Sequence, residues 1–322
     1  MKFALLFPGQ GSQKVGMGLD LYKESEVGKN LIDQVDTLLG RNISNIFSHG
    51  PSEELNQTKN TQISIVTISV ALTLLLKAEL KTRDIEFLPF ACAGHSLGEF
   101  TALWFTNILT LEELIKIISI RGNLMQNAPR GGMAAILSVE LESLKKLLEG
   151  SLLKDKVIIA NYNSPSQFVI SGEKEIVTKV CEEVKSICGK AIILPVSGAF
   201  HSMLMEEPSK IFNLELDKLD ILSKQNTEIP IYQNYDGRPT HDLKVINKKI
   251  KKQMTSPVYW TQTITSLVND GVRAVLEIGP GNVLTGLTKK INPTIDCYNI
   301  FDLSSLRDFI KNYECKFLSK RS

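Results

Sequence analysis

The stretch Phe87–Phe100 constrains the fold most. A short apolar run ends at Gly94, a helix-like run follows from Glu99, and Gly-x-Ser-x-Gly, centred on Ser96, lies between them. The two glycines allow a tight strand-to-helix turn that presents Ser96 on a strained backbone. The following helix directs its free N–H groups and positive end at the serine, where an oxyanion could be stabilised. The stretch predicts a nucleophilic serine in an α/β fold; the alternative is a glycine-rich βα turn with a surface serine.

Composition limits the classes of function. The 322 residues are 43% hydrophobic and 22% charged, with a formal net charge of +2. This fits one large globular domain, or one with a smaller insertion, and gives no sign of a nucleic-acid or membrane partner. The most apolar run, Ile63–Leu76, contains Ser and Thr and predicts a buried helix. Scattered cysteines without C-x-x-C spacing indicate reduced thiols in a cytoplasm, and the histidines lack metal-ligand spacing. We expect a cytoplasmic protein with no metal site.

The order of predicted elements indicates two subdomains. Buried strands are expected at 2–7, 229–233 and 272–278. Between residues 133 and 196 the pattern is strand, helix, strand, strand, helix, strand, which is the ferredoxin-like plan. We expect a hydrolase-like α/β large subdomain with a mostly parallel sheet, formed by residues 1–128 and 197–322. Residues 129–196 are expected to form an inserted ferredoxin-like small subdomain. A basic surface helix is expected over 303–322.

Two residues join Ser96 as candidates for chemistry. Arg121 shares a helical face with apolar residues three, four and seven positions earlier. A buried guanidinium needs an anion, which is either a buried acid or a substrate carboxylate held bidentately. His201 follows a strand, where it is a general base for Ser96 or a surface histidine. No acid between them suits a triad, so a backbone carbonyl is expected to orient the imidazole.

Taken together, these landmarks resemble the malonyl-CoA:acyl carrier protein transacylases of fatty-acid synthesis. The likeness covers almost the whole chain, and the motifs occur in family order. They are Phe7-Pro-Gly-Gln-Gly-Ser-Gln13, Gly94-His-Ser-Leu-Gly-Glu99, Arg121-Gly122, Met133-Ala134, Asn163-Ser-Pro165, Gly198-Ala-Phe-His201, Gln253 before Pro257 and Trp260, and Glu277-Ile-Gly-Pro-Gly281.

The resemblance implies a ping-pong transfer without a cofactor, in which a coenzyme A thioester is the substrate. Ser96 attacks malonyl-CoA with His201 as general base, and the malonyl-serine passes its acyl group to the phosphopantetheine thiol of acyl carrier protein. By the same analogy, the backbone N–H groups of Gln10 and Leu97 form the oxyanion hole. A monomer is the family default.

The resemblance also assigns three side chains around the acyl group. Arg121 binds the malonyl carboxylate, and the backbone carbonyl at Gln253 helps to orient His201. Phe200 resembles the malonyl-selective form of its segment, because its ring would crowd the 2-methyl branch of methylmalonyl.

Three alternatives stay open. The first is a polyketide-type acyltransferase that uses another acyl-CoA; since no carrier or ketosynthase segment is recognised, we expect a free-standing enzyme. The second is a serine esterase, which would not need Arg121. The third is a non-catalytic protein that binds the carrier and forms no covalent adduct.

Basic clusters suggest how an acidic carrier protein could be attracted. They are Lys248-Lys249-Ile-Lys251-Lys252, Lys289-Lys290 and Lys316–Arg321. One of them could steer the carrier to the site. Solvated lysines without a partner are the alternative for each cluster.

Overall fold

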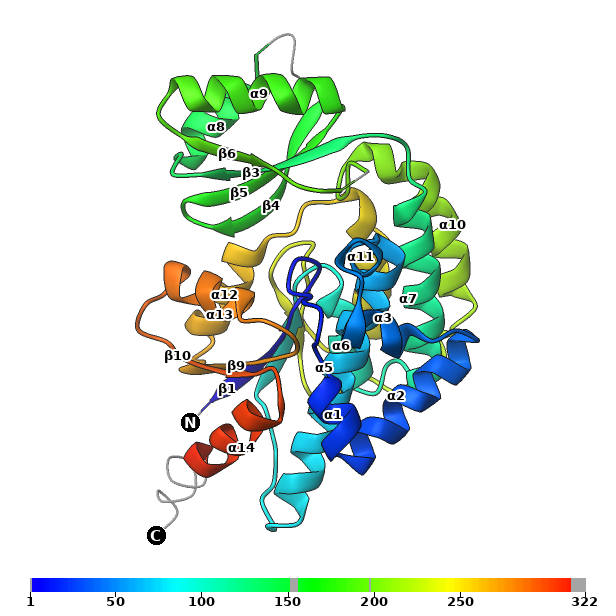
Figure 1. Cartoon of the computed structure of the whole chain (residues 1–322). Coiled ribbons are helices and arrows are strands. Elements are labelled where there is room, and N and C mark those ends of the chain that lie inside the picture. The colour runs from blue at the N-terminus through cyan, green and yellow to red at the C-terminus, as the bar shows by residue number, and fades with distance from the viewer. Residues whose placement is uncertain (1, 151–155, 197, 314–322) are drawn as a thin grey trace.

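The computed structural model describes residues 2–150, 156–196 and 198–313, whose strands form two sheets (Figure 1). The larger sheet has the order β10-β9-β1-β2-β7-β8. Its pairs are parallel except for β7 with β8, so the predicted mostly parallel sheet is confirmed. The strands are β1 (Phe3–Phe7), β2 (Ala91–Gly94), β7 (Ile231–Tyr232), β8 (Pro239–Thr240), β9 (Ala274–Ile278) and β10 (Asp296–Ile300).

Helices cover both faces of this sheet, and its strand β1 is accordingly apolar and buried along its whole length. Phe3, Leu5 and Phe7 pack in one core with α2 (Glu26–Leu39), α5 (Thr58–Lys81), α6 (Gly98–Phe105), α7 (Leu111–Gln126) and α10 (Glu206–Asp217). Ala4 and Leu6 point to the other face, against α12 (Trp260–Asn269) and α13 (Val283–Ile291). This alternation is the period of two expected of a strand buried on both faces. The other helices here are α1 (Leu19–Glu24), α3 (Ile43–His49), α4 (Ser52–Leu55) and α11 (Leu243–Ile250).

Helix α5 is long and apolar enough to cross a membrane, but its surroundings explain its composition. Of its most apolar 18-residue stretch, 78% is buried inside the protein. Its Ser and Thr hydroxyls at positions 64, 67 and 73 donate to backbone carbonyls four residues earlier, which satisfies them within the helix. The helix therefore belongs to the core, as the run Ile63–Leu76 predicts.

The smaller sheet has the order β4-β5-β3-β6, and every neighbouring pair is antiparallel. It is built from β3 (Gly132–Leu137), α8 (Leu141–Leu148), β4 (Val157–Ser164), β5 (Gln167–Gly172), α9 (Lys174–Ser186) and β6 (Lys190–Ile193). Order and direction confirm the ferredoxin-like plan. Figure 1 shows α8 and α9 on the face turned away from the larger sheet. The subdomain limits at 128/129 and 196/197 stay a prediction, and residue 197 lies outside the described residues.

Strand β4 includes the polar stretch 161–164. Pairing with β5 continues through two irregularities in the register, between Ile159 and Asn161 and between Tyr162 and Ser164. Asn161 and Asn163 are therefore strand residues two positions apart, and both line the same cavity.

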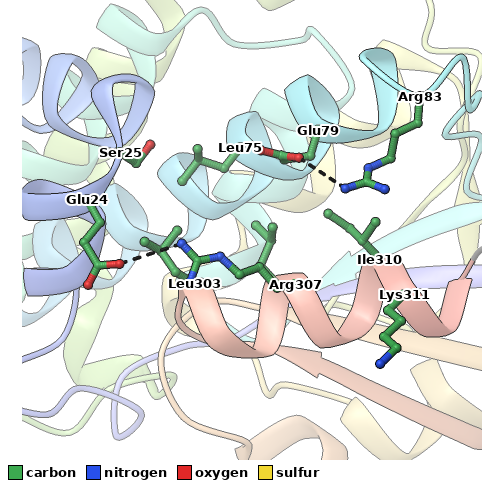
Figure 2. Close-up of a pocket in the computed structure, with 10 residues that line it drawn as sticks. Glu24, Ser25, Leu75, Glu79, Arg83, Leu303, Arg307, Ile310 and Lys311 are labelled. Atoms are coloured by element: carbon green, nitrogen blue, oxygen red, sulfur yellow. Dashed lines mark ion pairs between the residues drawn. The ribbon is translucent and has the colours of Figure 1, made fainter.

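Helix α14 (Leu303–Tyr313) is more buried than the predicted surface helix. Leu303, Leu306, Phe309 and Ile310 are all buried, at the spacing of one helical face. In Figure 2 this face turns toward α5, and Arg307 and Glu24 form an ion pair of 3.7 Å beside it. The basic end of the tail, residues 314–322, lies outside the described residues.

Candidate active site

Ser96 lies on the predicted turn between β2 and α6. Its φ of +49° is in the left-handed region, which a serine occupies only when its surroundings hold it. A Cβ on Gly94 would lie 1.9 Å from the carbonyl carbon of Gly98, and one on Gly98 would lie 2.0 Å from the carbonyl oxygen of Phe7. The side chain of Asn234 completes the turn, since its Oδ1 accepts from the N–H of Ser96 at 2.6 Å and its Nδ2 donates to the carbonyl of Gly94 at 2.6 Å. Close backbone packing therefore forces the serine outward.

His201 lies beside this serine. Its Nδ1 is 2.9 Å from the carbonyl oxygen of Gln253 and 3.1 Å from that of Ser256. Because carbonyls only accept, Nδ1 carries the proton and Nε2 is left to accept from Ser96 Oγ at 2.7 Å. His201 is 4% exposed, which excludes the surface alternative. Burial, together with the charge of Arg121, lowers the pKa of His201 to about 3. The imidazole is thus a neutral base in the correct tautomer.

Arg121 projects from α7 into the same place and is 1% exposed. Its Nη1 donates to Gln62 Oε1 at 2.9 Å, and its Nη2 donates to Ser96 Oγ at 3.0 Å and to Gln253 Oε1 at 3.1 Å. Its Nε has no partner among the described residues, and none of their acidic groups forms an ion pair with it. Burial lowers its pKa to about 10, so the group stays charged near neutral pH. No salt bridge to a buried acid therefore holds this guanidinium among the described residues: its direct partners are neutral oxygens, and the charge of Glu99 acts on it at longer range.

The serine opens into a cavity of about 240 Å³ between the two sheets. Gln10, Leu97, Phe200 and Arg121 line it beside Ser96 and His201, so six of the seven predicted site residues meet here. The seventh, Gln253, contacts the site through hydrogen bonds instead. Residues of β3, β4 and β5 form part of the wall. A ligand would therefore be enclosed between the larger and the smaller sheet.

These features prompt a comparison with known proteins. The sequence pattern of the acyl transferase domain matches residues 4–297. The chain belongs to this acyl transferase family. It is 36% identical to the malonyl CoA-acyl carrier protein transacylase of Bacillus subtilis (strain 168) over 310 residues, and this alignment covers 94% of each chain. Family membership makes the chain an acyltransferase.

Solved acyl transferases share the fold. The acyl carrier protein S-malonyltransferase of Vibrio cholerae is 35% identical, with a TM-score of 0.87 over 96% of this chain and 100% of that one. A malonyl-transacylase solved in complex with its type II PKS acyl-carrier protein (PlMCAT:AntF, holo) is 32% identical, with a TM-score of 0.88 over 97% of this chain and 100% of that one. The predicted fold class and the resemblance are thus confirmed.

Several residues of this acyl transferase site were not predicted from the sequence. Glu99 is buried in α6, and its carboxylate accepts from the Nε2 of Gln253 at 3.0 Å. Gln62 lies directly before the apolar run Ile63–Leu76, and its Oε1 accepts from Arg121. His95 Nε2 lies 2.8 Å from Asn163 Oδ1, which joins the turn of the nucleophile to the smaller sheet. His95 lies within the Gly-x-Ser-x-Gly pattern and Glu99 directly follows it, but no local signal in the sequence indicates which residues they contact.

The acyl transferase site contains no recognisable metal cluster. Within residues 2–150, 156–196 and 198–313, no three His, Cys, Asp or Glu side chains are grouped so that they could hold a metal ion. The groups suited to chemistry here are those of acid–base and nucleophilic catalysis.

Proposed function

We propose that the protein transfers the malonyl group from malonyl-CoA to the phosphopantetheine thiol of an acyl carrier protein, as its relatives' names describe. One observation carries the proposal. The Oγ of Ser96 lies within hydrogen-bond distance of both a neutral imidazole, on His201, and a buried guanidinium without an acidic partner, on Arg121. A simple esterase needs the first contact and has no use for the second.

In the first half-reaction, Ser96 Oγ attacks the thioester carbonyl and its proton passes to His201 Nε2. The N–H groups of Gln10 and Leu97 receive the oxyanion. The intermediate then breaks its carbon–sulfur bond, and coenzyme A leaves with the proton from His201. The carbonyls of Gln253 and Ser256 hold the imidazolium, as an acid does in a triad.

In the second half-reaction, the carrier thiol gives its proton to His201 and attacks the malonyl-serine ester. The ester oxygen recovers the proton, which regenerates Ser96. Throughout, Arg121 binds the free carboxylate of the acyl group bidentately. Phe200 limits the space beside its second carbon. Every step uses side-chain and backbone groups of the chain, so no cofactor is required.

The carrier docks on the rim formed by α13 and the turn between β4 and β5. The Nζ of Lys290 donates to Oε1 of Gln167, a residue that lines the cavity. The other described basic cluster is less available, because Lys249 pairs with Asp236 and Lys251 with Asp217. The solved carrier complex of a relative supports a carrier partner. The chain acts as a cytoplasmic monomer, without nucleic acid or membrane.

Intact-protein mass spectrometry after brief mixing with malonyl-CoA tests the proposal. The wild type should gain one malonyl group, Ser96→Ala none, and added carrier protein should discharge the adduct. Labelling by another acyl-CoA in place of malonyl-CoA would favour the polyketide-type alternative. Labelling by no acyl-CoA would favour the non-catalytic carrier-binding protein.

A further inference from the structure

Glu99 is a buried carboxylate that lies beneath the site and does not line the cavity. It is 1% exposed, in the first turn of α6. Its Oε1 accepts from Gln233 Nε2 at 3.0 Å, and its Oε2 accepts from the N–H of Asn234 at 3.1 Å and from Gln253 Nε2 at 3.0 Å. Among the described residues it belongs to no ion pair, and the charge of Lys249 acts on it only at longer range. Burying a charge whose hydrogen-bond donors are all neutral costs folding free energy. We therefore expect this carboxylate to serve a function.

Two of these donors belong to residues that hold the reacting groups. The side chain of Asn234 fixes the peptide of Ser96. Gln253 holds His201 through its backbone carbonyl and Arg121 through its side-chain oxygen, and its Nε2 also donates to the carbonyl of Ser96 at 2.9 Å. Glu99 is thus one residue removed from each reacting side chain.

The direction of the Gln253 amide follows from the chemistry of its neighbours. Glu99 and the Ser96 carbonyl only accept, so the NH₂ end of the amide must face them. Its oxygen must then face the guanidinium of Arg121, as observed at 3.1 Å. The reverse orientation would set NH₂ against a cation and leave a buried carboxylate without a donor. Burial raises the pKa of Glu99, and its hydrogen bonds from Gln253, Asn234 and Gln233 oppose that rise.

We propose that Glu99 is a positioning residue, which sets the orientation of Gln253 and thereby the aim of Arg121, so that selectivity for malonyl over acetyl depends on a carboxylate that the substrate never touches. The inference rests on the proposed function. Its distinguishing feature is that loss of Glu99 lowers malonyl loading more than acetyl loading, because only the malonyl group carries a free carboxylate for Arg121 to bind.

Glu99→Met tests this by removing both acceptors while roughly keeping the volume. The ratio of malonyl to acetyl loading rates on Ser96 should fall about tenfold or more, because an unpaired buried amide loses its fixed geometry. Glu99→Gln should recover the ratio to within about threefold. Its oxygen can serve Gln253 and Asn234, and its NH₂ can turn to Gln233, whose Oε1 has no partner among the described residues.

A double-mutant cycle and a control separate positioning from general damage. Gln253→Met should lower the same ratio, and adding Glu99→Met should lower it little further, since both act through one contact. Glu277 is another fully buried carboxylate, which accepts from the N–H groups of Leu284 and Thr285 in α13. Glu277→Met should reduce stability yet leave the ratio within about twofold.

The outcomes are distinguishable. Wild type that malonyl-CoA does not label overturns the proposed function itself. Wild type that is labelled, with Glu99→Met losing malonyl and acetyl loading equally, overturns only the positioning role. If Glu99→Met does not fold, an unchanged ratio in Gln253→Met overturns it instead, because the orientation of that amide would then not matter.

Discussion

Arg121 donates a hydrogen bond from Nη2 to Oγ of Ser96 at 3.0 Å, so the cation touches the hydroxyl that the site exposes. An acyl group bonded to that oxygen places its carbonyl carbon at the guanidinium as well. In the proposed malonyl-serine, the far carboxylate is one methylene away from that carbonyl carbon and so lies within reach of the same cation. The proposed role of Arg121 thus favours a short acyl chain with a terminal carboxylate, and malonyl is such a group.

Arg121→Ala should lower loading from malonyl-CoA by roughly two to three orders of magnitude, because the carboxylate would lose a buried bidentate partner. Loading from acetyl-CoA should fall much less. Quenched-flow labelling of Ser96 with both thioesters measures the two rates. Arg121→Lys, which keeps the charge and loses the fork, should fall between. Equal losses for malonyl and acetyl in Arg121→Ala would show that the guanidinium merely supports the serine.

Loading should be nearly independent of pH between about 5.5 and 8, because the pKa of His201 is lowered to about 3 by burial. The neutral, active form of the base then dominates across the range. A histidine with the ordinary pKa near 6.5 would lose about tenfold at pH 5.5. Single-turnover labelling with malonyl-CoA distinguishes the two. An acid limb near pH 6.5 that vanishes in His201→Ala would contradict the assignment.

Phe200→Ala should admit methylmalonyl-CoA. Phe200 lines the cavity and is buried, and removing its ring opens space of the size of a methyl branch. The ratio of methylmalonyl to malonyl labelling should rise about tenfold, measured by competition in one mixture. Leu287→Ala, which enlarges the same cavity from α13, is the matched control. A comparable rise of this ratio in Leu287→Ala would mean that the total volume of the cavity, and not the position of Phe200, sets the preference for malonyl over methylmalonyl.

Lys290→Glu should raise the KM for carrier protein about threefold to tenfold, since a rim charge acts mainly on encounter with an acidic partner. Loading of Ser96 by a malonyl thioester that lacks the nucleotide should not change. Lys248→Glu places the same charge change on α11 and should leave the carrier KM as it is. The proposed docking face would be wrong if Lys290→Glu and Lys248→Glu changed the carrier KM equally, or if the increase in KM persisted at high salt.

The residues themselves marked the local parts of this site, whereas its long-range contacts were predicted only through the resemblance or were missed. Ser96 was marked by its glycines, and Arg121 by a charge on an apolar helical face; both signals lie within a few residues. The ferredoxin-like order followed from alternating short elements. By contrast, Asn234 and Gln253 approach Ser96 from more than a hundred residues away, and nothing in their own segments specifies that meeting. Asn234 was therefore not predicted, and Gln253 was predicted only from the resemblance.

Two omissions had a common physical cause. Asn163 on β4 and Gln62 in the apolar α5 were not predicted to be site residues. In both places a polar side chain in a regular element faces the site, where its hydrogen bonds are made by residues distant in sequence. Local hydropathy identifies where a chain is buried and cannot identify which buried polar group has a function.

The contact between His95 and Asn163 supplies an optical signal. Besides that hydrogen bond, the ring of His95 packs edge-on against the indole of Trp260, with 5.4 Å between their centroids. Separating the two sheets would release His95 from Asn163 and change the surroundings of this indole. The chain has two tryptophans, so replacing Trp104 with Phe leaves Trp260, near the nucleophile, as the single tryptophan. Its emission would then report any change in these contacts during turnover without an added label.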